Sequence, residues 1–259
     1  MQLLTSPRNP LLKEVKRAVA RGGLTDQGLC VAEGFHILDE ALRSDCEVAV
    51  VFAAESVQPR VEAQKQTRVV GLPDELFRTL AATETSQGVL ALVRPPVWTL
   101  DQLFQKRSLV IVLDAVQDPG NAGTILRSAE AFGATGVALL KGSVNPYNPK
   151  CVRASAGSVF RVPLVAAVEE AALLAAVDRH GVDMVALATD GSLDIAEWDF
   201  KRPSVVIVGS EGRGIGDSLR AKSTAVRIPT AGVESLNAAM AAGIALYEAR
   251  RQRSRHEPV

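Results

Sequence analysis

Short apolar runs alternate along the chain with amphipathic stretches, and glycines and prolines separate them. Several runs are rich in Val, Ile and Leu with little polar alternation, which is typical of parallel strands buried on both faces. We predict strands at residues 47–52, 87–93, 109–113, 136–140, 184–188, 205–209 and 225–228. We predict helices at residues 10–20, 34–43, 122–132, 169–178, 217–221 and 236–253. Strands that alternate with helices indicate an α/β fold with a largely parallel sheet.

A double proline, Pro95-Pro96, interrupts this pattern after residue 94. Proline has no amide proton to donate to a sheet ladder, so the preceding strand should end there. We therefore expect an N-terminal domain of residues 1–94, a linker of residues 95–107 and a C-terminal domain of residues 108–259, which are ordinary domain sizes. We also expect a fragment of residues 97–259 to fold by itself.

Composition serves mainly to exclude classes of protein. The chain has 259 residues with 29 Lys+Arg and 29 Asp+Glu, so its formal net charge is zero and a nonspecific polybasic coat for nucleic acid is excluded. No apolar run reaches about 18 residues and the start lacks a signal-peptide pattern, so we expect no membrane association. The three scattered cysteines indicate a reducing compartment, and we expect a cytoplasmic protein.

Basic residues gather near both ends of the chain in spite of the zero net charge. The first cluster contains a single acid, Glu14, and its cations are Arg8, Lys13, Lys16, Arg17 and Arg21. The last predicted helix ends in Arg250, Arg251, Arg253 and Arg255. A charge run is usually a solvated face, and a helix C-terminus favours arginine through its dipole. Contacts to phosphates are the alternative interpretation.

Three segments of the C-terminal half contain more than packing requires. The first, residues 113–127, leaves a buried strand through Asp118-Pro119-Gly120 and enters a helix near Asn121. Asn121 is a natural N-cap, so a purely structural interpretation is open. However, Gly120 and Gly123 permit close approach of a ligand, and Arg127 would lie near the carboxyl edge of the sheet, where open α/β sheets bind ligands.

The second segment, residues 205–216, has four glycines in eight residues directly after a strand, which favours a loop around a small molecule. Its glycine spacing fits neither a Walker A loop nor a dinucleotide fingerprint, which disfavours a nucleotide-dependent oxidoreductase. The third, residues 228–240, ends a strand at Pro229 and begins a helix at Ser235, a candidate N-cap. A helix N-terminus also offers free amides to a ligand. Leu236, Met240 and Ile244 have the spacing of a core stripe.

Taken together, the three segments resemble the motifs of a known family in order and spacing. Asp-Pro-Gly-Asn-Ala-Gly-Thr-Ile-Leu-Arg, Gly-Ser-Glu-Gly-Arg-Gly and Ile-Pro-Thr-Ala-Gly-Val-Glu-Ser-Leu-Asn are similar to those of the SpoU (TrmH-like) RNA ribose 2′-O-methyltransferases of the SPOUT superfamily. The resemblance covers residues 108–253. Residues 1–93 more weakly resemble the substrate-binding domain of that family, through Ser6-Pro7-Arg8-Asn9-Pro10 and Val31-Ala32-Glu33-Gly34-Phe35.

The resemblance implies a parallel-sheet SPOUT domain with a deep trefoil knot, preceded by a small α/β substrate-binding domain. It implies S-adenosylmethionine as methyl donor, RNA as substrate, no metal ion and a homodimer formed through the C-terminal domain. The residues implied in cofactor binding are Leu187, Thr189, Gly209, Gly212, Ile228, Leu236 and Asn237. The implied catalytic residues are Arg127, Asn121, Glu211, Ser235 and Asn237. The basic cluster of the first helix then becomes a candidate RNA-binding surface.

The implied reaction moves a methyl group from a sulfonium to a ribose 2′-hydroxyl, which must lose its proton. A guanidinium is effectively never deprotonated, so we expect Arg127 to stabilise the developing alkoxide and to clamp a phosphate. The proton acceptor stays open among Glu211, Ser235, an RNA phosphate and water. By analogy we expect 23S ribosomal RNA as the substrate. Transfer RNA, and a noncatalytic RNA-binding protein of the same fold, are the alternatives.

Overall fold

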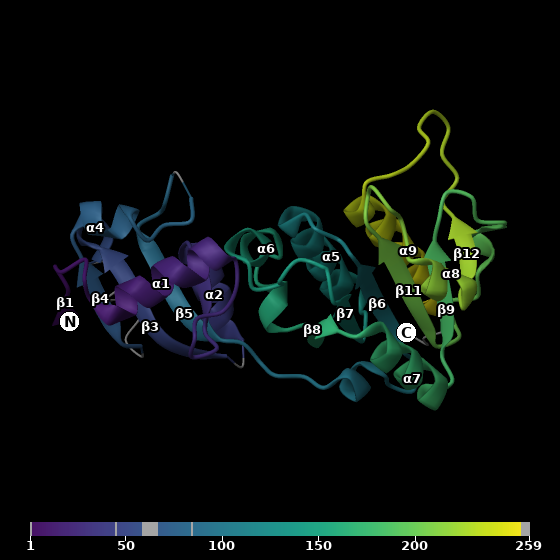
Figure 1. Ribbon diagram of the computed structural model, residues 1–259, viewed down its shortest axis with the longest axis horizontal. Helices are drawn as coiled ribbons and strands as arrows, with labels where there is room; N and C mark the ends of the chain where they lie inside the picture. The colour runs from purple at the N-terminus through teal and green to yellow at the C-terminus, as the bar shows by residue number, and fades with distance from the viewer. Residues whose placement is uncertain (1, 45, 59–66, 84, 255–259) are drawn as a thin grey trace. The chain divides into compact units, whose positions relative to one another are not determined.

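A computed structural model describes residues 2–44, 46–58, 67–83 and 85–254 of the chain, which divides into two units (Figure 1). The N-terminal unit holds the residues up to Pro96 together with Asn145–Arg161. The C-terminal unit holds Val97–Val144 and the residues from Val162 onward. In the described part of the chain, no helix is long and apolar enough to cross a membrane.

The N-terminal unit is built on a five-stranded mixed sheet with the order β1-β4-β3-β5-β2. β4 pairs in parallel with β1 and β3, whereas β5 pairs antiparallel with β2 and β3. The strands are β1 (Gln2–Leu3), β2 (Cys30–Glu33), β3 (Glu47–Ala54), β4 (Val69–Leu72) and β5 (Val89–Arg94). The helices of this unit are α1 (Pro10–Arg21), α2 (Phe35–Arg43), α4 (Asp74–Arg78) and α6 (Pro149–Ala154). The sequence pattern missed β1, β2 and β4, because two to four residues are too few to show a period.

Helix α1 shows how the sequence forms this unit. The Asn9 side chain accepts a hydrogen bond from the Leu11 amide, Pro10 opens the helix, and Gly22 ends it with a φ of 65°. Leu12, Val15 and Ala18 recur at helical spacing and are fully buried against the sheet. The basic side chains of α1 therefore lie on the opposite face of the helix.

The C-terminal unit contains a seven-stranded sheet in which all strands are parallel, with the order β10-β12-β9-β11-β6-β7-β8. The strands are β6 (Leu109–Asp114), β7 (Gly136–Leu140), β8 (Leu164–Val168), β9 (Asp183–Leu187), β10 (Leu193–Asp194), β11 (Ser204–Gly209) and β12 (Thr224–Arg227). The helices are α5 (Pro119–Phe132), α7 (Glu170–His180), α8 (Asp217–Ala221) and α9 (Ala238–Ser254). The predicted α/β class and parallel C-terminal sheet are confirmed, while the trefoil knot stays a prediction.

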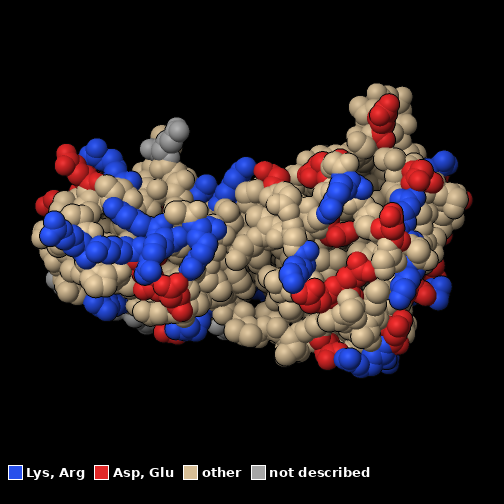
Figure 2. Space-filling model, viewed as in Figure 1, with Lys and Arg blue, Asp and Glu red and all other residues tan. Residues whose placement is uncertain are grey.

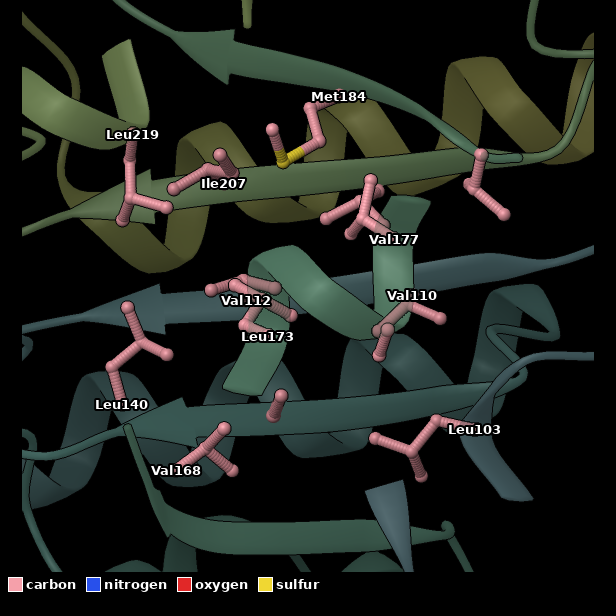
Figure 3. Packing of buried hydrophobic residues seen from close by; sticks show 14 of the residues in the cluster. Leu103, Val110, Val112, Leu140, Val168, Leu173, Val177, Met184, Ile207 and Leu219 are labelled. Carbon is pink, nitrogen blue, oxygen red and sulfur yellow. The ribbon is translucent and has the colours of Figure 1, made fainter. Parts of the chain in front are cut away.

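Helices cover both faces of this sheet. On one face, Leu173 and Val177 of α7 pack over Val110 and Val112 of β6 and their neighbours, as Figure 3 shows. On the other face, α5 and α9 pack against each other and α9 contacts β11. Burial on both faces explains why the central strands read as unbroken apolar runs. Leu103 and Phe104, expected in a linker, belong to this core, since they are 0% and 7% exposed.

One segment departs from the domain boundaries expected from sequence. Residues 145–161 follow β7 in the chain but belong to the N-terminal unit, where α6 contacts β2 and Arg161 pairs with Glu40 at 2.6 Å. Cys151 and Val152 of α6 are fully buried there. A fragment of residues 97–259 would leave this segment without its packing partners, so we no longer expect that fragment to fold by itself.

Candidate active site

Three segments that follow the carboxyl ends of neighbouring parallel strands line a cavity of about 720 Å³. The strands are β9, β11 and β12. The residues singled out from sequence that line it are Leu187, Thr189, Gly209, Glu211, Ile228, Ser235, Leu236 and Asn237. Parallel strands bring their carboxyl ends to one edge of the sheet, which explains why segments distant in sequence meet here.

Asn121 is not the cap of helix α5, so the purely structural interpretation of this residue does not hold. The helix begins at Pro119, and its N-cap is Asp118, whose side chain accepts a hydrogen bond from the Asn121 amide at 2.8 Å. Asp118 takes this role because the proline that follows it favours the first helical position. The Asn121 side chain is therefore released from capping and is available to other groups.

The glycine-rich loop after β11 is a tight, internally bonded turn. The Ser210 amide donates to the Gly214 carbonyl and the Gly214 amide donates back, at 3.2 and 2.9 Å. A Cβ on Gly209 would lie 2.3 Å from the Gly214 carbonyl carbon, so only glycine fits at that position. The Gly216 amide donates to Asp114 at the end of β6, at 2.8 Å. Asp114 thus ties this loop to the neighbouring strand, a role that no pattern in the sequence indicated.

The helix of the third segment begins later than the sequence predicts. α9 starts at Ala238, and the Asn237 side chain accepts hydrogen bonds from the amides of Ala239 and Met240 at 3.0 and 3.2 Å. Asn237 is therefore the capping residue, whereas Ser235 lies outside the helix and lines the cavity. Met240 is 58% exposed and is not part of a core stripe.

Asn121 joins the three segments. Its amide nitrogen donates to the Glu211 carboxylate of the second segment. Its amide oxygen accepts from Asn237 Nδ2 of the third segment, at 3.0 Å. The amide thus uses its donor and its acceptor at once, which fixes its orientation. Three of the predicted catalytic side chains form one hydrogen-bonded row at the edge of the cavity.

Two predicted site residues lie apart from this row. Arg127 is exposed on α5, nearly two turns after Asn121, and does not line the cavity. No described residue forms a hydrogen bond or ion pair with it that would hold it in place. Gly212 is exposed at the tip of the glycine-rich loop and does not line the cavity either. Among the wall residues that sequence analysis missed are four charged ones, Asp190, Arg220, Arg227 and Glu234.

The predicted RNA-binding cations lie on and beside α1, where Figure 2 shows Lys and Arg side chains gathered over the N-terminal unit. Arg8, Lys13, Arg17 and Arg21 are exposed, and Lys16 is half-buried. The structure also places an acid among them: Asp26 pairs with Arg17 and with Arg21, each at 3.3 Å.

At the arginine-rich end of α9, Arg250 is exposed, whereas Arg253 is part of the fold and not of a solvated face. Arg253 is only 8% exposed, and burial lowers the pKa of its guanidinium. The guanidinium donates to four backbone carbonyl oxygens, those of Phe200, Arg107, Ser108 and Arg202. Arg251 pairs with Glu248 at 2.7 Å, and Arg255 lies outside the described residues.

Known families match nearly the whole chain. The model of the SpoU rRNA methylase family matches residues 108–247, and that of the MRM3-like substrate-binding domain matches residues 9–91. The two matches correspond to the two halves that the sequence resemblance distinguished.

Individual proteins agree with this assignment. An uncharacterized tRNA/rRNA methyltransferase of Synechocystis is 36% identical over 96% of this chain and 93% of its own. The 23S rRNA (guanosine(2553)-2′-O)-methyltransferase RlmP of Bacillus subtilis is 29% identical over 96% of this chain and all of its own. The crystal structure of the SpoU methyltransferase AviRb of Streptomyces viridochromogenes in complex with AdoMet superposes with a TM-score of 0.85, at 27% identity, covering 95% of this chain and 99% of that one.

These matches span both halves of the chain, and the structure brings the three segments of the C-terminal half together at a single cavity. The chain therefore belongs to the SpoU rRNA methylase family and is an S-adenosylmethionine-dependent RNA methyltransferase, which confirms the family, the enzyme class and the cofactor predicted from the three motifs.

Proposed function

We propose that this protein methylates a ribose 2′-hydroxyl of 23S ribosomal RNA, with S-adenosylmethionine in the cavity at the carboxyl edge of the C-terminal sheet. The observation that carries the proposal is the row Glu211–Asn121–Asn237, which joins the three segments beside that cavity. The names of relatives such as RlmP support the ribosomal target.

The cavity suits the methyl donor. Its volume lies within the range of sites for small molecules and cofactors, about 300–1,000 Å³. Leu187, Ile228 and Leu236 offer apolar surface to an adenine ring. Gly209 lets the backbone of Gly214 close against the end of β11, and both glycines line the wall of the cavity. The bound donor supplies an electrophilic sulfonium methyl, which needs no metal ion for activation.

The residues of this chain orient the acceptor hydroxyl and handle its proton. Alignment of the hydroxyl with the methyl group can supply about 7–11 kcal/mol of the barrier. Asn121 holds the Glu211 carboxylate at the cavity wall, which makes Glu211 our first candidate for the proton acceptor. A positioned acceptor adds roughly 10²–10⁴-fold to the rate. Arg127 stabilises the developing alkoxide and binds a phosphate beside the target ribose.

We further propose that the active site is completed in a homodimer. Arg127 does not line the cavity of its own chain, so a second subunit is the natural source of the guanidinium. Met240 and Tyr247 of α9 are 58% and 57% exposed, and Phe132 of the adjacent α5 stacks edge-on against Tyr247. Exposed apolar side chains on packed helices favour an interface between subunits.

The N-terminal unit supplies RNA affinity. The exposed cations of α1 contact phosphates in this proposal, and the MRM3-like substrate-binding domain matched over residues 9–91 supports this division of labour. With RNA as the substrate, we expect the protein to act in the cytoplasm.

Unmodified 23S ribosomal RNA and total transfer RNA, each incubated with the protein and radiolabelled S-adenosylmethionine, test the proposal. We expect label in 23S RNA, at a linkage that resists alkali because a methylated 2′-oxygen cannot attack the neighbouring phosphate. Label in transfer RNA alone would contradict the target, and alkali-sensitive label would contradict the ribose position. RNA binding without label would favour a noncatalytic RNA-binding protein.

A further inference from the structure

The charged side chains of the cavity wall differ in whether they are paired. Five line it, namely Asp190, Glu211, Arg220, Arg227 and Glu234. Both arginines are held by aspartates of one short segment, residues 190–194. Arg220 Nη2 lies 2.5 Å from Asp190 Oδ1, and Arg227 Nε lies 2.6 Å from Asp194 Oδ1.

The backbone fixes this segment in place. The Ala188 amide donates to the Val226 carbonyl at 2.9 Å, and Asp194 pairs with Arg227 in the parallel register of β10 and β12. A Cβ on Gly191 would lie 2.6 Å from the backbone carbon of Val226, so the segment approaches β12 as closely as glycine allows. The register of β10 and β12 thus places the Asp194 carboxylate opposite Arg227, and the turn before β10 brings Asp190 to Arg220 of α8.

The hydrogen bond from Arg220 holds the pKa of Asp190 below its ordinary value. With both guanidiniums paired, the carboxylates of Glu211 and Glu234 give the wall an excess of negative charge. Such a wall attracts a cation and repels an anion.

This charge pattern bears on the choice between adenosyl ligands. S-adenosylmethionine carries a sulfonium cation, its product S-adenosylhomocysteine lacks that charge, and adenosine phosphates are anions that share the same adenosyl group. An arginine without a partner is a strong phosphate ligand, so Arg220 and Arg227 would attract adenosine phosphates if they were not masked.

We propose that Asp190 and Asp194 are specificity-determining residues, which mask the two cavity arginines and thereby select the cationic adenosyl donor over anionic adenosine phosphates. The proposal rests on the proposed function, because it assumes that the cavity binds S-adenosylmethionine.

The test is calorimetric titration of the full-length Asp190→Asn/Asp194→Asn variant with S-adenosylmethionine, S-adenosylhomocysteine and ATP. Asparagine keeps an oxygen that accepts from the guanidinium, so the change removes charge and retains shape. We expect the Kd of S-adenosylmethionine to rise about tenfold and that of ATP to fall about tenfold, since two unit charges near the ligand are removed. The Kd of S-adenosylhomocysteine should change by less than about threefold.

Asp183→Asn is the matched control. Asp183 begins the same strand, β9, and pairs with Arg202 at 2.6 Å, but neither residue lines the cavity. Its three Kd values should equal those of the unaltered protein. If the double variant proves unstable in thermal denaturation, the single Asp190→Asn variant replaces it. Its Kd values should change in the same directions, with fold-changes about a third as large.

Two results would overturn the proposal. Equal weakening of all three ligands would mean that the segment only shapes the wall, and an unchanged ratio of ATP to S-adenosylmethionine affinity would mean that masking is irrelevant. Both are measured without RNA. Failure of the proposed function would appear separately, as absence of labelled 23S RNA with the unaltered protein.

Discussion

The two basic clusters look alike in sequence, but Arg17 and Arg21 in the first and Arg253 in the second have opposite surroundings. Arg17 and Arg21 of α1 keep more than half of their side-chain surface exposed and share one carboxylate, that of Asp26. Arg253 of α9 is buried and donates only to backbone carbonyls. An exposed ion pair contributes about 0–1 kcal/mol to stability, whereas a buried cation is costly unless every donor is satisfied. Arg17 and Arg21 are thus accessible to a partner, whereas Arg253 is part of the fold.

The largest effect that we expect concerns Arg127, the arginine to which we assign a role in the reaction. Arg127→Ala should lower methyl transfer at least about 10³-fold, because it removes the charge that stabilises the developing alkoxide. The Kd of S-adenosylmethionine, measured by calorimetry, should stay within about twofold, since Arg127 does not line the cavity. Arg179→Ala, an exposed arginine on α7, is the control. A large loss of donor binding in Arg127→Ala would contradict the assignment.

Arg253→Met should destabilise the protein by about 3 kcal/mol, because four backbone carbonyl oxygens would each lose a charged hydrogen-bond donor. The free energy of unfolding from denaturant titration measures this change. Arg21→Met, on the exposed face of α1, should cost less than about 1 kcal/mol. Equal losses in the two variants would refute the contrast between the clusters.

Reversal of three α1 cations should weaken RNA binding without affecting the donor site. For the triple variant Lys13→Glu/Arg17→Glu/Arg21→Glu, we expect RNA affinity to fall at least about tenfold. The slope of log affinity against log salt should fall by about 0.7–0.9 for each lost phosphate contact. Filter binding at several salt concentrations gives both values.

The matched control reverses three cations elsewhere on the same unit, Arg43, Arg68 and Arg78. If this variant loses as much RNA affinity and as much salt dependence as the first, then net charge rather than the α1 surface governs binding.

The smallest expected effect belongs to Asp26, the acid within the basic cluster. Asp26→Asn should strengthen RNA binding about threefold, because the carboxylate competes with phosphates for Arg17 and Arg21. The same filter-binding assay detects it. Weaker binding would show that Asp26 orients the two guanidiniums for RNA instead of competing for them.

The sequence predicted which residues form the site better than it predicted what each of them does locally. Glu211, Ser235 and Asn237 were predicted, and the structure brings them to one cavity. Their local roles were not predicted. Asp118 and not Asn121 caps α5, and Asn237 and not Ser235 caps α9. Several residue types cap helices almost equally well, so sequence alone leaves neighbouring candidates undecided.

The sequence by itself determined the alternation of strands and helices, the parallel nature of the second sheet and the family, because apolar periodicity and glycine-rich motifs are local features of the chain. Only the tertiary structure decided that residues 145–161 return to the N-terminal unit, that Arg253 is buried, and that Asp190 and Asp194 hold Arg220 and Arg227. Charge and burial depend on which distant segments meet, and the spacing of residues along one chain does not contain that information.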